Sequence, residues 1–109
     1  IREADGLAMS SRNINLSDSE RQRAPAIYRT LIMGKERIEE GQRDATAIIT
    51  DIRATIERDL TTDIDYISIV HPDTLVQVTE ITSPVVIAIA VRMAKVRLID
   101  NISASPPVK

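Results

Sequence analysis

Residues 45–70, which read ATAIITDIRATIERDLTTDIDYISIV, change their hydrophobic period partway along, and this change decides the predicted fold class. In the first part, apolar side chains recur every three or four residues, which is the period of an amphipathic helix. The last part is rich in β-branched residues and ends at a turn signal that begins with His71. We therefore expect a helix over residues 44–60, with Asp44 as its N-cap, followed by a strand over residues 64–70.

A second helical stripe precedes this stretch and predicts a helix over residues 17–40. The apolar positions of the stripe are Ala24, Ile27, Leu31, Gly34 and Ile38. Pro25 lies inside the stripe, so it should kink the helix or delay its regular start. Gly41 is a suitable C-terminal stop, because glycine readily adopts the left-handed conformation that ends many helices. The two helices should form an antiparallel hairpin with one apolar side to cover.

Two further strands are expected after the hairpin, over residues 85–91 and 96–102. The run at 85–91 is continuously apolar, which favours a strand that is buried on both faces. Residues 75–81 are either a short strand or an extended loop, and residues 103–109 are expected to form a tail. The predicted fold class is α+β, with a two-helix hairpin packed on a small, mainly antiparallel three- or four-stranded sheet.

The composition restricts the partners that this chain can have. A net charge of −2 gives no general attraction to nucleic acid or anionic membranes, and aromatic residues for base stacking make up only 2%. No nucleic-acid or membrane partner is therefore expected. With no cysteine and a single histidine, no metal site is predicted. The sequence begins at Ile1 and not at methionine, which we interpret as a fragment or a processed chain.

The stretch Met9-Ser10-Ser11-Arg12-Asn13 holds the strongest candidates for chemistry. It belongs to a segment, residues 1–16, that lacks a sustained hydrophobic period and is predicted to be an ordered loop. Serine hydroxyls, an arginine fork and backbone N–H groups can all donate hydrogen bonds to phosphate oxygens. On these residues alone, a solvated turn is the more common structure.

The surrounding sequence adds a resemblance to a known family. The stretch from Arg2 to Asn13 resembles the domain-junction segment of pantothenate synthetases. Asp73-x-Leu75 and the stretch from Arg97 to Asn101 resemble later motifs of the same C-terminal domain, in the same order. The resemblance implies that residues 1–16 are an ATP-phosphate loop at a domain junction and that residues 17–102 are a C-terminal lid domain.

The resemblance also implies roles for individual residues. Ser10, Ser11 and Arg12 would be the catalytic group, which holds the ATP phosphates and stabilises the leaving pyrophosphate. Met9 and Ile1 would contact ATP as well, with Ile1 lining the adenine pocket through its backbone. Mg²⁺ would be bound through the nucleotide.

The implied whole enzyme is a cytoplasmic ligase that condenses pantoate with β-alanine through a pantoyl adenylate and releases AMP and pyrophosphate. A Rossmann-like N-terminal domain, which is absent from this sequence, would carry the pantoate and β-alanine sites, and the full-length enzyme would be a homodimer. The isolated chain is therefore expected to be inactive. The alternative is a non-catalytic α+β protein-interaction module whose apolar face docks a partner.

The remaining polar candidates are interpreted as structural. His71 is assigned to a turn. Asp63 and Asp65 are expected to be solvated at the start of a strand. Arg97 and Asp100 are expected to form a local ion pair that pins the last strand.

Overall fold

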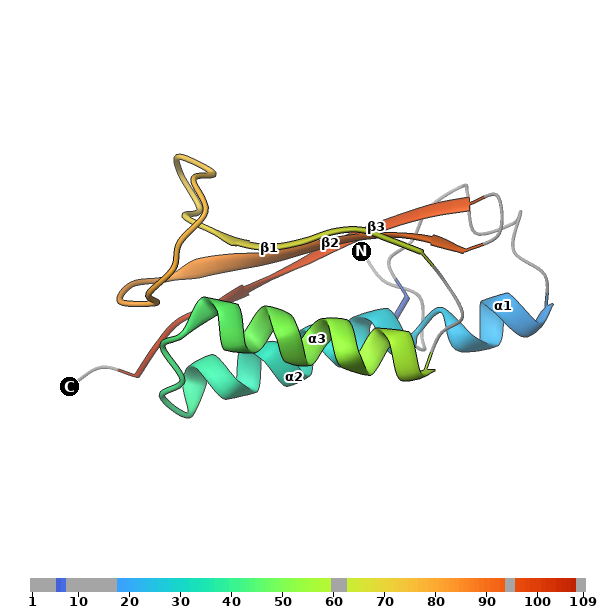
Figure 1. Ribbon diagram of the computed structural model, residues 1–109, viewed down its shortest axis with the longest axis horizontal. Helices are drawn as coiled ribbons and strands as arrows, with labels where there is room; N and C mark the ends of the chain where they lie inside the picture. The colour runs from blue at the N-terminus through green and yellow to red at the C-terminus, as the bar shows by residue number, and fades with distance from the viewer. Residues whose placement is uncertain (1–5, 8–17, 60–62, 94–95, 108–109) are drawn as a thin grey trace.

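The computed structural model describes residues 6–7, 18–59, 63–93 and 96–107. The helices and strands follow one another in the order α1 (Asp18–Arg23), α2 (Ala26–Glu39), α3 (Ala45–Asp59), β1 (Asp63–Val70), β2 (Val85–Met93) and β3 (Val96–Ala104). The strands form one antiparallel sheet in the order β1-β2-β3. α2 and α3 lie side by side on one face of this sheet (Figure 1).

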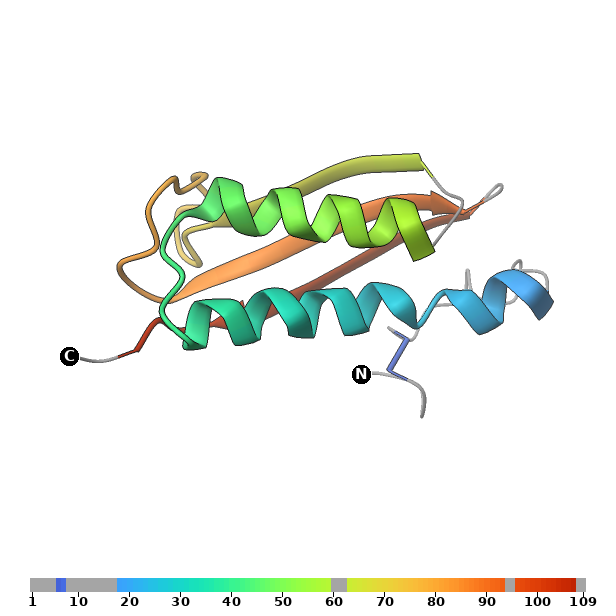
Figure 2. The ribbon, with the colours of Figure 1, turned by 60° about the horizontal axis from the view of Figure 1, so that its bottom comes forward.

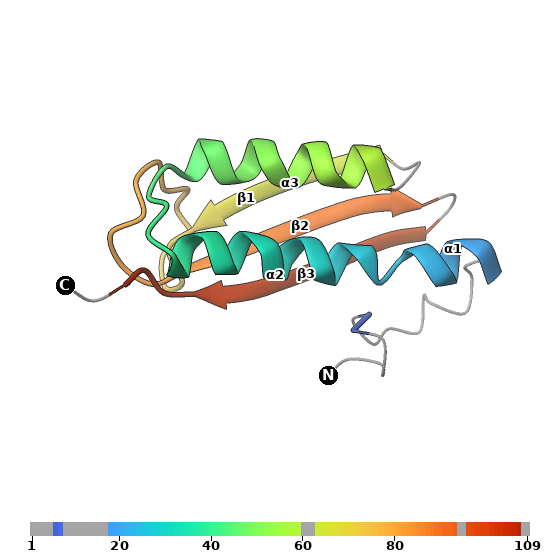
Figure 3. The ribbon, with the colours of Figure 1, turned by 90° about the horizontal axis from the view of Figure 1, so that it is seen from below.

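The two long helices divide the sheet between them. α2 packs on β3 and α3 packs on β1, with β2 in the centre of the sheet (Figure 2, Figure 3). The core between the layers is aliphatic, as the low aromatic content requires. Its largest fully buried side chains are Leu31, Ile38, Ile48, Ile52, Ile56, Ile69, Ile81, Ile87, Ile89, Val91 and Met93. The predicted α+β fold class is confirmed, and the residues that the structure describes form a sheet of three strands.

The helix predicted over residues 17–40 is divided in two at Pro25. α1 ends at Arg23 and α2 begins at Ala26, with a turn between them. Proline has no backbone N–H to donate to the preceding turn, so a regular helix cannot continue through this position. Pro25 keeps helical backbone angles, φ −59° and ψ −16°, and is the N-cap of α2. The proline therefore delays the regular helix, as its position predicts.

The turn between α2 and α3 ends α2 with a Schellman motif. Gly41 has a φ of +111°, and its N–H donates to the carbonyl of Ile38 at 3.1 Å. The N–H of Gln42 donates to the carbonyl of Arg37 at 2.9 Å. These two bonds satisfy carbonyl groups that a helix end otherwise leaves unpaired. Gly41 is therefore the helix stop that the sequence predicts.

The start of α3 is fixed by Asp44, as predicted. Its Oδ1 accepts hydrogen bonds from the N–H groups of Thr46 at 3.0 Å and Ala47 at 3.3 Å. The same turn holds the loop that joins β1 to β2, since the N–H of Ile81 donates to the carbonyl of Arg43 at 2.8 Å. Ile81 is fully buried, so this loop is attached to the core.

The loop between β1 and β2 includes residues 75–81, for which the sequence left two readings open. The segment touches β1 through a single bridge between Val70 and Gln77, and it is not a strand of the sheet. Leu75 has a φ of 60° and is exposed. Residues 75–81 therefore form the extended loop, which was one of the two predicted alternatives.

β2 does not have the two buried faces that its apolar run predicted. Its alternate side chains, such as Ile87 and Ile89, face the helices and are fully buried. On the opposite side, which we call the outer face, Val86 and Ala88 are only half-buried. The prediction is wrong for most of the outer face because both long helices lie on the other side of the sheet (Figure 1).

β3 continues further than the predicted strand over residues 96–102. It runs through Ala104, which is buried and pairs with Val85 at the start of β2. The tail expected over residues 103–109 therefore begins too early, since Ser103 and Ala104 belong to the sheet. Pairing with β2 satisfies their backbone groups, which a reading of isolated segments cannot foresee.

Candidate functional site

The five predicted ATP contacts, Ile1, Met9, Ser10, Ser11 and Arg12, lie outside the described residues, so their roles stay predictions. Gly6 and Leu7 are the described part of the segment, residues 1–16, that is predicted to be the ATP-phosphate loop. Leu7 is 4% exposed and belongs to the hydrophobic core cluster, together with Ala24 in the turn before α2 and Ile27 in its first turn. This buried leucine attaches the loop to the same core that holds the helices and the sheet.

Gly6 adds a second attachment, to the ring of Tyr28 on α2. A Cβ atom at Gly6 would lie 2.6 Å from Cδ2 of Tyr28, which is closer than real Cβ atoms come to another heavy atom. Gly6 also has a φ of +94°, in the region that favours glycine. The ring therefore lies against the bare Cα of the glycine, and both features require glycine at this position.

A second group of polar residues lies on the outer face of the sheet, and we call it the outer-face cluster: Asp65, Tyr66, Arg92 and Arg97. The carboxylate of Asp65 accepts a hydrogen bond from Nε of Arg97 at 2.7 Å and lies 3.5 Å from Nε of Arg92. The guanidinium of Arg97 also lies 5.9 Å from the centre of the Tyr66 ring. One carboxylate from β1 thus joins arginines from β2 and β3.

The outer-face cluster corrects two predictions. Arg97 and Asp100 do not pair, because residues three apart on a strand point to opposite faces, and Arg97 binds Asp65 instead. Asp65 is an exposed residue, as predicted, but it does have partners, since two arginines bind its carboxylate and leave its side chain 27% exposed. A β-bulge between Ile64 and Tyr66 interrupts the pairing of β1 with β2 at Asp65 and redirects the strand there.

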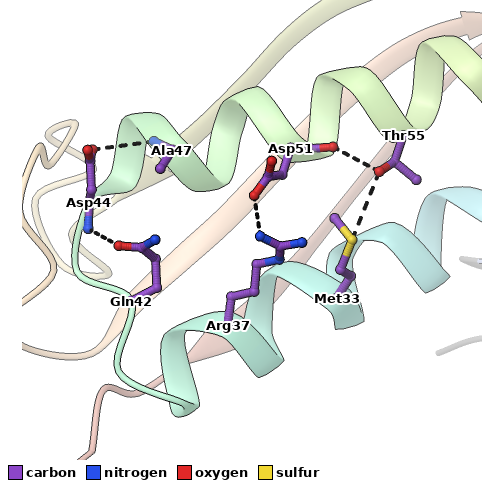
Figure 4. Close-up of polar contacts among 7 residues, drawn as sticks. All are labelled: Met33, Arg37, Gln42, Asp44, Ala47, Asp51 and Thr55. Carbon is purple, nitrogen blue, oxygen red and sulfur yellow. Dashed lines mark hydrogen bonds and ion pairs between the residues drawn. The ribbon is translucent and has the colours of Figure 1, made fainter.

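The exposed side of the helical hairpin carries a third set of polar contacts (Figure 4). Arg37 on α2 forms an ion pair with Asp51 on α3. The hydroxyl of Thr55 donates to the backbone carbonyl of Asp51 at 2.8 Å and lies 3.9 Å from Sδ of Met33. A shallow hollow beside them is lined by Met33, Glu36, Arg37, Glu40 and Gln42. The contacts of Arg37 with Asp51 and of Thr55 with Met33 join the two helices, and we assign them a structural role.

The only histidine serves the turn to which the sequence assigns it. Nδ1 of His71 accepts hydrogen bonds from the N–H groups of Asp73 at 3.1 Å and Thr74 at 3.4 Å. Across the described ranges, no group of three or more His, Cys, Asp or Glu side chains is placed to hold a metal ion. None of the described helices has the length and apolar character needed to span a membrane.

Sequence reasoning missed both the contact between Gly6 and Tyr28 and the ion pairs of Asp65. The signal for the first was an isolated glycine within the predicted loop, which can mark a position where the backbone needs a positive φ or a close approach. The signal for the second was weak, because it depends on strand register and on a bulge. Opposite charges on separate predicted strands suggest an ion pair only once the pairing is known.

Comparisons with known proteins agree on one family. The family model described as pantoate-beta-alanine ligase matches residues 1–103. A pantothenate synthetase from Caldicellulosiruptor bescii is 47% identical over 102 residues, which cover 94% of this chain and 36% of that protein. One from Nitratidesulfovibrio vulgaris is 48% identical over 102 residues, covering 93% of this chain and 36% of the relative. The chain therefore spans 36% of the length of these curated relatives.

The fold comparison gives the same result. The crystal structure of pantothenate synthetase from Thermus thermophilus superposes with a TM-score of 0.88 and 34% sequence identity. The superposition covers 97% of this chain and 38% of that one. Both the helical hairpin and the sheet are thus shared with a solved member of the family.

Proposed function

This chain belongs to the pantoate–β-alanine ligase family, and on that premise we propose that it is the C-terminal, ATP-binding lid domain of a pantothenate synthetase. The observation that carries the proposal is the family match across residues 1–103, which includes the Ser-Ser-Arg segment as well as the folded core. Family membership favours this function over the alternative of a non-catalytic interaction module.

The proposed reaction has two steps. A carboxylate oxygen of pantoate attacks the α-phosphorus of ATP, a P–O bond forms, and the bond to pyrophosphate breaks, which gives pantoyl adenylate. The amine of β-alanine then attacks the acyl carbon of this mixed anhydride and loses a proton, and AMP leaves. A lid that covers the nucleotide excludes water, which would otherwise hydrolyse the anhydride.

In the first step, Ser10, Ser11 and Arg12 hold the phosphates. Negative charge moves onto pyrophosphate as the α-phosphorus is attacked, and fixed donors stabilise that charge without reorganising. The planar guanidinium of Arg12 can donate two parallel hydrogen bonds to phosphate oxygens. Met9 and the backbone of Ile1 complete the proposed contacts with ATP, and Ile1 lies at the adenine pocket.

The described anchor of the loop supports this role. Donors that stabilise a transition state must be held in place before the reaction, because misplacement by a short distance is costly. Leu7 is buried in the core, and Gly6 lies against Tyr28. Residues 6–7 would therefore move together with α2 and the sheet as one body when the lid closes.

The other components of the proposed enzyme lie outside this chain. Mg²⁺ would enter with ATP as part of the substrate, bound through the phosphates. A Rossmann-like N-terminal domain would supply the pockets for pantoate and β-alanine, and the full-length enzyme would be a cytoplasmic homodimer. The shared 36% coverage of the relatives is compatible with such a division of labour.

The proposal predicts opposite behaviour for this chain alone and for a full-length pantothenate synthetase that contains it. The isolated chain should form no detectable pantothenate from ATP, pantoate and β-alanine, because it lacks the pockets that align the reactants. The full-length enzyme should release AMP and pyrophosphate in step with pantothenate, as followed by chromatography of the nucleotides. Turnover by the isolated chain would refute the assignment.

Isotope transfer tests the adenylate itself. With pantoate that carries oxygen-18 in its carboxylate, the attacking oxygen stays on phosphorus when β-alanine displaces AMP. Mass spectrometry of the AMP should therefore find one labelled oxygen. Unlabelled AMP, or release of ADP and phosphate, would contradict an adenylate intermediate and favour a different activation of the acid.

A further inference from the structure

The contact between Gly6 and Tyr28 joins the loop to a specific side chain of α2. A Cβ atom built on Gly6 would lie 2.6 Å from Cδ2, 3.3 Å from Cε2 and 3.4 Å from Cγ of Tyr28. All three atoms belong to the ring, so one edge of the ring faces the glycine. The contact excludes any side chain at Gly6 unless the ring moves.

Tyr28 is held on a helix that is itself fixed in the core. Its neighbour Ile27 is 2% exposed, and Leu31 on the next turn is fully buried. Residue 7, directly after the glycine, is also buried. The main chain at residues 6–7 is therefore held from two directions, by the ring on one side and by the leucine in the core.

We propose that Tyr28 is a positioning residue for the ATP-phosphate loop, which sets the direction in which the chain leaves Gly6 and Leu7. The inference rests on the proposed function of that loop and adds a residue that acts on it from α2. Its ring carbons make the contact, so the aromatic ring carries this role.

The test uses a full-length pantothenate synthetase that contains this segment and measures the two half-reactions separately. Tyr28→Ala should slow adenylate formation by roughly 10- to 100-fold, the scale expected when catalytic groups are misplaced by about 1 Å. The joining of preformed pantoyl adenylate to β-alanine should stay near its normal rate, because no triphosphate takes part. Tyr28→Phe should restore adenylate formation, since it keeps the ring.

Tyr66→Ala is the matched control. Tyr66 is the other of the two tyrosines in the chain and lies on the outer face of the sheet, 38% exposed. The control variant should leave both half-reactions near normal. If Tyr28→Ala behaves like Tyr66→Ala, or if it slows both half-reactions equally, Tyr28 has no positioning role and the inference is wrong.

Substitution on the loop side keeps the inference testable if Tyr28→Ala fails to fold. Gly6→Ala should slow adenylate formation selectively, because its methyl group would collide with the ring. In the double variant the two losses should not multiply, since both changes disturb one contact. Multiplicative losses would mean independent roles and would overturn the inference. If Arg12→Ala leaves adenylate formation normal, the proposed function of the loop fails instead.

Discussion

Ile87 and Ile99 lie on adjacent strands but on opposite faces of the sheet. Ile87 is fully buried against the helices, whereas Ile99 is 47% exposed on the outer face. Ile87→Ala should lower the free energy of unfolding by roughly 2–5 kcal/mol, because it removes buried methyl groups and leaves a cavity. Ile99→Ala should cost about 0.5 kcal/mol or less. Urea denaturation of the chain measures both, and equal losses would contradict the assignment of the core to the helical side.

Asp65 provides a residue-scale test of the outer-face cluster. Asp65→Asn leaves Arg92 and Arg97, which are opposite each other in the register of β2 and β3, without their shared carboxylate. These side chains are partly exposed, so the expected loss in unfolding free energy is only about 0.2–1 kcal/mol.

This loss should shrink in high salt, because exposed charges are screened. Asp73→Asn is the control, since it removes the same charge from an exposed loop residue outside the cluster. Thermal denaturation at two salt concentrations distinguishes the two variants. A salt-independent loss at Asp65, or an equal loss at Asp73, would argue against the ion pairs.

At the scale of elements, substitutions of Asp44 test whether its side chain stabilises the start of α3. Asp44→Ala removes the acceptor for the N–H groups of Thr46 and Ala47 and should cost about 0.5–2 kcal/mol of unfolding free energy. Asp44→Asn keeps a side-chain oxygen and should lose much less. Denaturant unfolding measures both variants. If Asp44→Asn lowers the free energy of unfolding as much as Asp44→Ala does, the negative charge at the start of α3 stabilises the helix and the capping hydrogen bonds do not.

The elements show which kinds of structure the sequence predicts. The helical hairpin was predictable because its signals are local: a stripe of apolar residues, Pro25 at the break, Gly41 at the end and Asp44 at the next start. Strand positions were predicted as well, but their ends and exposed faces were not. Those depend on which strand pairs with which and on the side that the helices cover.

The pairs between elements were the least predictable part. Arg97 was assigned to Asp100 because the two are close in sequence, and it binds Asp65 on another strand. Strand alternation alone argues against the first pairing. The second depends on register and on the bulge at Asp65, neither of which the sequence indicates. Local spacing is therefore a poor guide to ion pairs across a sheet.

At the scale of the whole molecule, the candidate site depends on one short loop joined to a stable two-layer domain. The motif around Ser10 to Arg12 was recognised from its sequence, and the family match across residues 1–103 agrees with that recognition. The contact between Gly6 and Tyr28 was not foreseen, because it joins a loop to a helix face through tertiary packing. The roles of the phosphate-binding residues remain a proposal.

The proposed role of Arg12 is tested directly by the rate at which Arg12→Ala forms the adenylate in a full-length pantothenate synthetase that contains this segment. We expect a slowing of roughly 10²–10³, the scale seen when one transition-state donor is lost. Arg12→Lys should recover only part of the rate, because an ammonium keeps the charge but not the bidentate geometry. The joining of preformed pantoyl adenylate to β-alanine should stay near normal. Normal adenylate formation in Arg12→Ala, or equal slowing of both half-reactions, would contradict the proposed role of the loop.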